Sequence, residues 1–348
     1  MMPEEWPIAS PGENGDEPAR VAGRGRLSTV RRDFFLDPAK RLKEQERALM
    51  SVMLNALVSD VADAVRAALP TGRIAANDAG DAALVEALTS SRLLDETGLM
   101  RILLRRADEE RIATAAKARS GRREARVLQG LVSSDHAAVA AAAMALILGR
   151  GRRRGRFGEA LLTADDLPVA SAAYLVHVIA AALRREVAGT PGAAATDQEL
   201  AEASRRMLAS HDNQRGLDAL IANLVGALEG TGGLTDELIL AAANEGEVAF
   251  ISAVFARRAQ VTGDAALNEL LSGDSRAVIA LLRMAGVSRD LCARLLAAIG
   301  DLFGIDDPGS AIAAFDSLSD DQAEAARACL LTDPAYRAAL DRLGPGRG

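Results

Sequence analysis

Five arginines stand close together near the middle of the chain, at Arg150, Arg152, Arg153, Arg154 and Arg156. Guanidinium groups bind carboxylates and phosphates, so this spacing predicts a docking patch for an anionic partner. The alternative interpretation is a solvated, Gly-rich connection in which Arg150 alone suits the negative end of the preceding helix. We expect the other four side chains to be exposed, and we name all five as candidate partner-binding and anion-binding residues.

The overall charge decides which anionic partner is favoured. The chain has a net charge of −7 and a pI near 5.3, whereas nucleic-acid-binding domains are usually basic. Affinity for nucleic acid that rested on five arginines would be weak and would fall steeply with salt. Phe157 is the one aromatic residue nearby, so base stacking has little support. We therefore favour an acidic protein partner, and nucleic acid remains the alternative.

Histidines and cysteines, the usual ligands of transition metals, are few and widely spaced. His136, His177 and His211 are not three or four residues from one another or from a cysteine. Cys292 and Cys329 do not form a CxxC pair, so we expect no metal site. We expect His177 to be a core or half-buried residue, His211 to end a helix, and both thiols to be buried and inert.

Other sequence patterns that are associated with catalysis or cofactors are better interpreted as structural features, such as helix starts and turns. His136 beside Asp135 could accept a phosphoryl group, but the following AAVAAAAM offers no side chain to stabilise it, so an exposed first-turn residue is the favoured interpretation. The chain has no GxSxG, and its Gly-rich stretches at 149–158 and 230–233 lack GK[ST]. The acidic clusters at 165–168, 305–308 and 319–322 fit helix starts. We predict no cofactor, no catalytic residue and no enzymatic activity.

The composition indicates the elements that must position these residues. Of the 348 residues, 49% are hydrophobic and only 3% aromatic, and alanine and leucine supply most of the apolar content. These two residues favour helices, while the β-branched and aromatic residues that favour strands are scarce. The sequence therefore predicts an all-α fold.

The order of helices follows from periodicity and punctuation. Prolines and charges in residues 1–30 predict a disordered tail. Asp37 as N-cap and Pro38 begin a long helix that ends before Pro70, and Thr196 and Thr235 are further predicted N-caps. Shorter amphipathic segments follow near 79–89, 95–107, 109–119, 123–133, 135–149, 167–187, 196–210, 216–229, 235–244, 247–260, 264–271, 274–285, 288–303, 308–317, 320–331 and 334–343.

Two stretches, 131–146 and 270–285, share a frame in which an apolar turn, a small residue and an acid precede a helix. A looser third copy spans 242–259. Recurring helix–turn–helix units predict an irregular, HEAT-like stack of antiparallel helix pairs, an α-solenoid. The alternative is an irregular helical globule. The stretch AGTPGAAATD (188–197) divides the prediction into a block over 31–190 and a repeat block over 196–343.

Several of these stretches resemble a known bacterial family. They are RRDFFLDPAKRLKEQERALMSVMLNALV, LVHVIAAALRRE, LTDELILAAANEGEVAFISAVFARRAQV and LLSGDSRAVIALLRMAG. Their order along residues 31–300 is similar to that in the uncharacterised family catalogued as domain of unknown function 2336. The resemblance implies a HEAT-like helical stack and assigns no activity or catalytic residue.

The longest apolar runs, 137–148 and 169–183, are shorter than the roughly 20 residues that span a bilayer. We therefore expect no membrane span, and two cysteines in a chain this long predict a cytoplasmic location. Stacked helix pairs present extended surfaces, so we predict a scaffold or adaptor that binds another protein. Binding of nucleic acid or another polyanion through residues 150–156, or a helical receptor or enzyme with a hidden pocket, remains open. The identity of the partner and the oligomeric state also remain open.

Overall fold

The computed structural model describes residues 42, 44–70, 78–120, 126–186, 193–333, 336 and 343. Contacts divide the chain into residues 1–43 and residues 44–348, and the following description concerns the second unit. The predicted tail over 1–30 and the predicted helix start at Asp37 and Pro38 lie outside the described residues.

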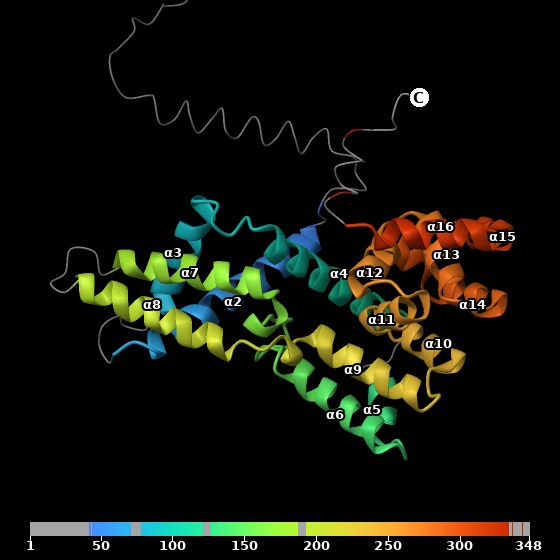
Figure 1. The fold of residues 1–348 in the computed structure, drawn as a ribbon, viewed down its shortest axis with the longest axis horizontal. Helices are drawn as coiled ribbons and strands as arrows, with labels where there is room; N and C mark the ends of the chain where they lie inside the picture. The colour runs from blue at the N-terminus through green and yellow to red at the C-terminus, as the bar shows by residue number, and fades with distance from the viewer. Residues whose placement is uncertain are drawn as a thin grey trace, which may run out of the picture. The chain divides into compact units, whose positions relative to one another are not determined.

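Helices make up the regular structure of the described residues, and no strand occurs among them (Figure 1). The all-α prediction is therefore confirmed. The α-helices are α2 (Glu44–Ala67), α3 (Asp78–Ser90), α4 (Thr97–Ser120), α5 (Arg126–Val132), α6 (Ala137–Gly151), α7 (Val169–Glu186), α8 (Ala193–Ser210), α9 (Leu217–Gly230), α10 (Asp236–Asn244), α11 (Val248–Ala259), α12 (Gly263–Leu271), α13 (Ser275–Met284), α14 (Arg289–Ile299), α15 (Pro308–Ser317) and α16 (Asp320–Leu331). Short 3₁₀ helices are η2 (Ala164–Asp166), η3 (Asn213–Arg215) and η4 (Gly300–Phe303).

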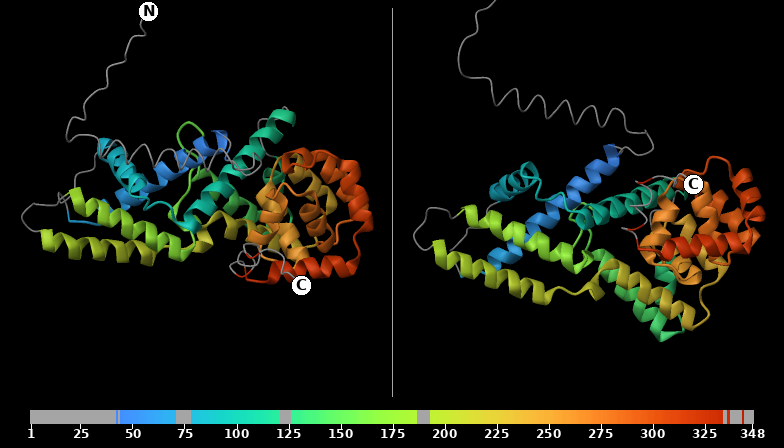
Figure 2. Two further views of the ribbon diagram at one scale, coloured as in Figure 1. Left: turned by 90° about the horizontal axis from the view of Figure 1, so that it is seen from above. Right: turned by 45° about the horizontal axis from the view of Figure 1, so that its top comes forward.

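Helices that follow one another in the chain pack together, as in a solenoid-like stack. Contacts join α5 to α6, α7 to α8, α10 to α11, and α11 to α12, and Figure 2 shows the long pair of α7 and α8 side by side. The three predicted repeat junctions are the turns between α5 and α6, α10 and α11, and α12 and α13. This packing is consistent with the predicted HEAT-like stack.

The turns use the local chemistry that the sequence indicates. Thr235 caps α10 by accepting a hydrogen bond from the Leu238 amide, and Asp274 caps α13 by accepting one from the Arg276 amide. Gly246 and Gly273 have φ values of +72° and +70°, which favour glycine because side chains with a Cβ are strained there. At Gly246 the constraint is doubled, because an added Cβ would lie 2.9 Å from the Ala113 Cα atom of α4.

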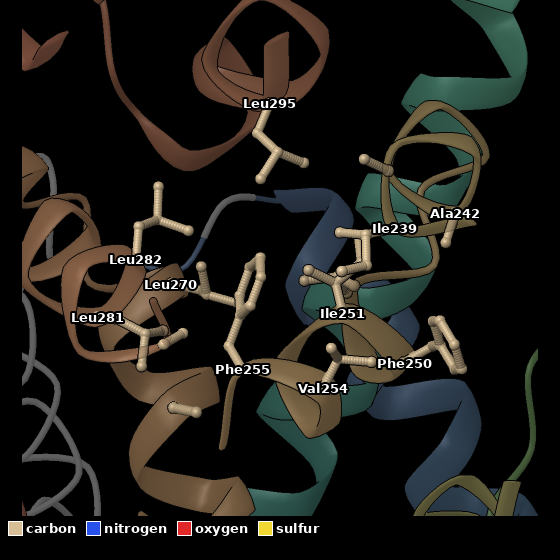
Figure 3. Packing of buried hydrophobic residues seen from close by; sticks show 14 of the residues in the cluster. Ile239, Ala242, Phe250, Ile251, Val254, Phe255, Leu270, Leu281, Leu282 and Leu295 are labelled. Carbon is tan, nitrogen blue, oxygen red and sulfur yellow. The ribbon is translucent and has the colours of Figure 1, made fainter. Parts of the chain in front are cut away.

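Buried apolar side chains form two clusters. The first draws on α2, α3, the first half of α4, α7 and α8. The second draws on the second half of α4 and on α5, α6 and α9–α16, and it surrounds Phe255 (Figure 3). The 24-residue helix α4 supplies residues to both. The predicted block boundary over 188–197 lies partly outside the described residues and stays a prediction.

Two predicted helix boundaries are wrong. Segments 95–107 and 109–119 form the single helix α4, because the charged run from Asp108 to Arg111 contains no Gly or Pro and is held by an ion pair of 3.4 Å between those two residues. Helix α8 begins at Ala193, ahead of Thr196, since the alanines there favour helix; Thr196 is buried inside it. Segment 288–303 ends at Phe303 as predicted, and its last turn is the 3₁₀ helix η4.

One described helix, α2, is long and apolar enough to cross a membrane by length and composition. It packs against α3, α4, α7 and α8, and one side contributes Met53, Leu57 and Val61 to the first cluster. A core helix of a soluble protein passes the same test, so this feature is weak evidence for a membrane span.

Candidate functional site

Helix α6 contains Arg150 and ends before the other four arginines, and its residues are almost all apolar. It reads AAVAAAAMALILGRG and carries a single charged residue, Arg150. Alanine and leucine give it high helix propensity, which compensates for an N-cap residue, His136, that makes no side-chain capping bond. The helix runs through Gly151, two residues past the predicted end, so Arg150 belongs to its last turn and Arg152 is its C-cap residue.

One side of α6 packs into the second cluster. Val139, Ala143, Leu146 and Gly149 are buried there, and the helix contacts α5 and α9 (Figure 1). An added Cβ on Gly149 would lie 2.4 Å from the Leu220 Cδ1 atom of α9. The absence of a side chain at position 149 therefore allows α6 and α9 to approach closely.

The opposite side of α6 is exposed and almost free of polar groups. We call this surface the α6 face; its residues are Ala137, Ala138, Ala141, Met144, Ala145, Leu148, Gly151 and Arg152. Leu148 is 56% exposed and Met144 is 43% exposed. An ordinary exposed helix side carries charges, as α8 does with Asp197, Glu202 and Arg205. The α6 face is thus an apolar surface that is bounded by an arginine at one end.

Three of the five predicted arginines form ion pairs with carboxylates of the same chain. Arg150 donates to Glu247 at the start of α11, with an Nη1–Oε1 distance of 2.8 Å. Arg154 donates to both carboxylate oxygens of Glu110 on α4, at 2.9 and 2.7 Å. These ion pairs connect the end of α6 to helices that are distant in the sequence, so the two guanidinium groups are already neutralised by partners.

The expected exposure of Arg153 is wrong. Its side chain is 5% exposed, and Nε donates to the Asp166 carboxylate at 2.7 Å. The remaining nitrogens donate to the Gly149 carbonyl at 2.9 Å and to the Thr163 hydroxyl and the Arg215 carbonyl at 3.0 Å each. A buried guanidinium is tolerated only when it is paired and hydrogen-bonded, and this one holds the turn after α6 against η2 and η3.

Asp166 is the matching buried charge. Burial raises the pKa of Asp166, but the hydrogen bond from Arg153 and the charges of Arg106 and Arg153 outweigh it, so the pKa lies below its ordinary value. Its carboxylate also accepts from the amides of Thr163 and Leu217 at 2.9 Å each. The acids at 165–168 therefore serve structure, although Asp166 does so by pairing with Arg153 as well as by capping η2.

Arg152 and Arg156 are the two candidates that remain available. Both are exposed, and neither side chain has an ion pair or hydrogen bond within the described part of the chain. Phe157 follows directly and is 89% exposed. Its amide donates to the Glu159 carboxylate at 2.9 Å, which fixes the backbone of this connection. The site therefore consists of the α6 face followed by two unpaired guanidinium groups and an exposed ring.

A cavity of about 270 Å³ lies beside this connection, among α4, the turn after α6 and the start of α11. Arginines and glutamates line it together, and the carboxylates of Glu109 and Asp218 outweigh the effect of burial and raise the pKa of Arg106. Within the described part of the chain, the charges that line this cavity are largely paired with one another. Among the described residues, no cluster of His, Cys, Asp and Glu could hold a metal ion.

The other predicted residues fall in scattered places. His136 is exposed, as expected, although it is the N-cap residue of α6 and does not lie in its first turn, and His211 follows the last residue of α8. His177 is exposed on α7, which contradicts the predicted core position. Cys292 is buried, but Cys329 is exposed, so the expectation of two buried thiols is wrong for Cys329. These residues do not form one site.

The sequence interpretation missed the α6 face. Alanine is compatible with either side of a helix, so an alanine-rich segment gives little indication of which side is exposed. The available signal was the absence of charge: between His136 and Arg150 there is no polar side chain on any side of the helix.

A family model described as "Uncharacterised protein conserved in bacteria (DUF2336)" matches residues 85–328. The matched span includes α4–α15, most of α16, the α6 face and all five arginines. It confirms the resemblance that the sequence suggests and assigns no activity. No curated protein and no solved structure matches the chain.

Proposed function

We propose that this chain, which belongs to the bacterial family DUF2336, is a helical-repeat protein that acts by binding another protein chain. The observation that carries the proposal is the α6 face, an exposed helix side on which no polar residue lies between Ala137 and Gly151. Contiguous exposed apolar surface is unfavourable in water and commonly marks a contact site. A stack of paired helices offers such a surface on a fixed support.

The residues around the face indicate the chemistry of the partner. The alanines make the surface flat, so a helix can approach closely while Met144 and Leu148 supply the larger apolar contacts. Arg152 and Arg156 place two unpaired positive charges at one end. A partner helix with an apolar side and an acidic end fits this arrangement, and acidic residues are common in the first turn of helices.

The same residues make other ligands less suitable. Helices that lie on membranes expose bulky apolar residues and a basic polar side, whereas half of the residues of this face are alanine. Nucleic acid would meet only two unpaired arginines here, because Arg150, Arg153 and Arg154 bind carboxylates of the protein itself. Both cysteines are free thiols, which supports our proposal of a reducing compartment such as the cytoplasm.

The proposal is tested by affinity capture from the native host with the full-length chain, in the presence of nuclease. The variant Leu148→Glu places a charge in the α6 face, and Leu331→Glu is its matched control because Leu331 is 60% exposed at the end of α16. We expect Leu148→Glu to lose a protein that the wild type and Leu331→Glu retain. Identical captured proteins for all three chains, or capture that vanishes with nuclease, would contradict the proposal.

A further inference from the structure

The exposed positions of α6 follow a spacing that is the same from either end of the helix. Starting at Ala137, successive exposed residues are separated by one, three, three, one, three, three and one positions, ending at Arg152. When two such helices run antiparallel, every exposed position of one meets an exposed position of the other. This spacing lets the two exposed sides overlap along their whole length in an isologous contact, as between two identical chains related by a two-fold axis.

The side chains also match in size in this register. Met144 lies opposite Ala145, and Leu148 lies opposite Ala141, so each large residue meets a small one. Gly151 lies opposite Ala138 at the ends. Alternation of large and small side chains lets two helices interdigitate, as knobs fit into holes in a coiled coil.

The charges at the ends of the face favour the antiparallel arrangement. Arg152 lies opposite Ala137, and Asp135 stands two residues before that alanine. Asp135 is exposed, and its carboxylate has no ion pair or hydrogen bond in the described residues. The antiparallel pair therefore brings each unpaired guanidinium toward the unpaired carboxylate of the other copy. A parallel pair would bring the arginines of both copies together.

We propose that the partner of the α6 face is a second copy of this chain, bound through antiparallel α6 helices. This inference rests on the proposed function and specifies its partner. Because the contact is limited to one helix from each chain, it belongs at the small end of specific interfaces, below about 1,200 Å² in total. The dimer should therefore form reversibly as the protein concentration rises.

Sedimentation velocity of the full chain from about 1 to 200 μM tests the dimer directly. The mass of the wild type and of Leu331→Glu should rise from 36.4 kDa toward twice that value. Leu148→Glu should shift the transition to at least tenfold higher concentration, because the new carboxylate would be buried opposite Ala141. Circular dichroism verifies that each variant is folded. A wild type that stays at 36.4 kDa throughout would overturn the inference.

Charge reversal tests the orientation of the two helices. Arg152→Asp and Asp135→Arg should each weaken association, because each places like charges opposite one another. The double variant should recover at least part of the wild-type association, since both pairs are restored with reversed sign. Arg276→Asp is the control, because Arg276 is exposed and unpaired elsewhere in the described chain. A double variant that associates no better than the single ones would contradict the antiparallel pairing.

The outcomes also separate this inference from the proposed function. If the wild type remains monomeric while Leu148→Glu still loses a captured protein, the second copy is excluded as the partner and the function of the face stands. If Leu148→Glu changes neither mass nor capture, both proposals fail. If the wild type dimerises and Leu148→Glu dimerises equally well, the dimer contact lies elsewhere and the inference is overturned.

Discussion

Replacing Arg153 with alanine should be far more destabilising than replacing the neighbouring Arg154. The Arg153 side chain is 5% exposed and makes four hydrogen bonds, one of them to the fully buried Asp166 carboxylate. Removing it leaves the carboxylate charged and without its ion-pair partner. Loss of one member of a buried ion pair costs about 3–5 kcal/mol of the free energy of unfolding.

Arg154→Ala is the internal standard, because that side chain is 40% exposed and binds Glu110 near solvent. An exposed ion pair contributes about 0.2–1 kcal/mol. Urea unfolding followed by circular dichroism compares the two variants. With a slope of about 3 kcal/mol/M, the midpoint for Arg153→Ala should fall by roughly 1–1.7 M, and that for Arg154→Ala by less than about 0.4 M. Equal midpoints for the two variants would refute the structural role assigned to Arg153.

Three further predictions concern the same architecture. Folding lowers the pKa of Asp166. The ionised carboxylate therefore contributes fully to the free energy of unfolding above the unfolded-state pKa of about 3.9, and this contribution is lost as the pH falls through the lower pKa of the folded state. Asp166→Asn should therefore show a smaller loss of stability than the wild type when urea midpoints are followed from pH 5 to pH 3; parallel curves would count against this. Gly246→Ala should lower the free energy of unfolding by about 1–3 kcal/mol more than Gly273→Ala does, as measured by urea or thermal unfolding. Both glycines have positive φ, but only an added Cβ at position 246 would also meet the α4 backbone. Equal losses for the two variants would argue against that contact. Cys329 is exposed and should react with a thiol reagent at pH 8. Burial raises the pKa of Cys292 to about 11 and should protect this thiol until the protein unfolds. Equal reaction rates for the two thiols would contradict the packing of α14.

The fold of this protein can be predicted from the sequence more fully than the candidate site can. Alanine and leucine content, turn glycines and caps such as Thr235 and Asp274 act locally, so helix type and most helix positions were predictable. The single helix α4 was not, because the ion pair between Asp108 and Arg111 supports a charged run that resembles a break.

The site depends on contacts between distant residues, and for this reason it was only partly predictable. Five arginines in a Gly-rich stretch look alike in sequence, yet Glu110 and Glu247 lie far from them along the chain and select which are neutralised. Arg153 becomes buried because Asp166 and the Arg215 carbonyl enclose it. The packing of α5 and α9 against α6 determines which side of α6 is exposed. An alanine-rich sequence does not indicate which side that is.

The most direct measurement is site-specific photo-crosslinking in living cells of the native host. A photoreactive residue would replace Leu148 in the α6 face, and the same residue at Leu331 would be the control. The account predicts a discrete protein adduct from position 148, whether a second copy of the chain or another protein, and none of that mass from position 331. The absence of an adduct at position 148, or the same adducts at both positions, would contradict the claim that the α6 face binds a protein.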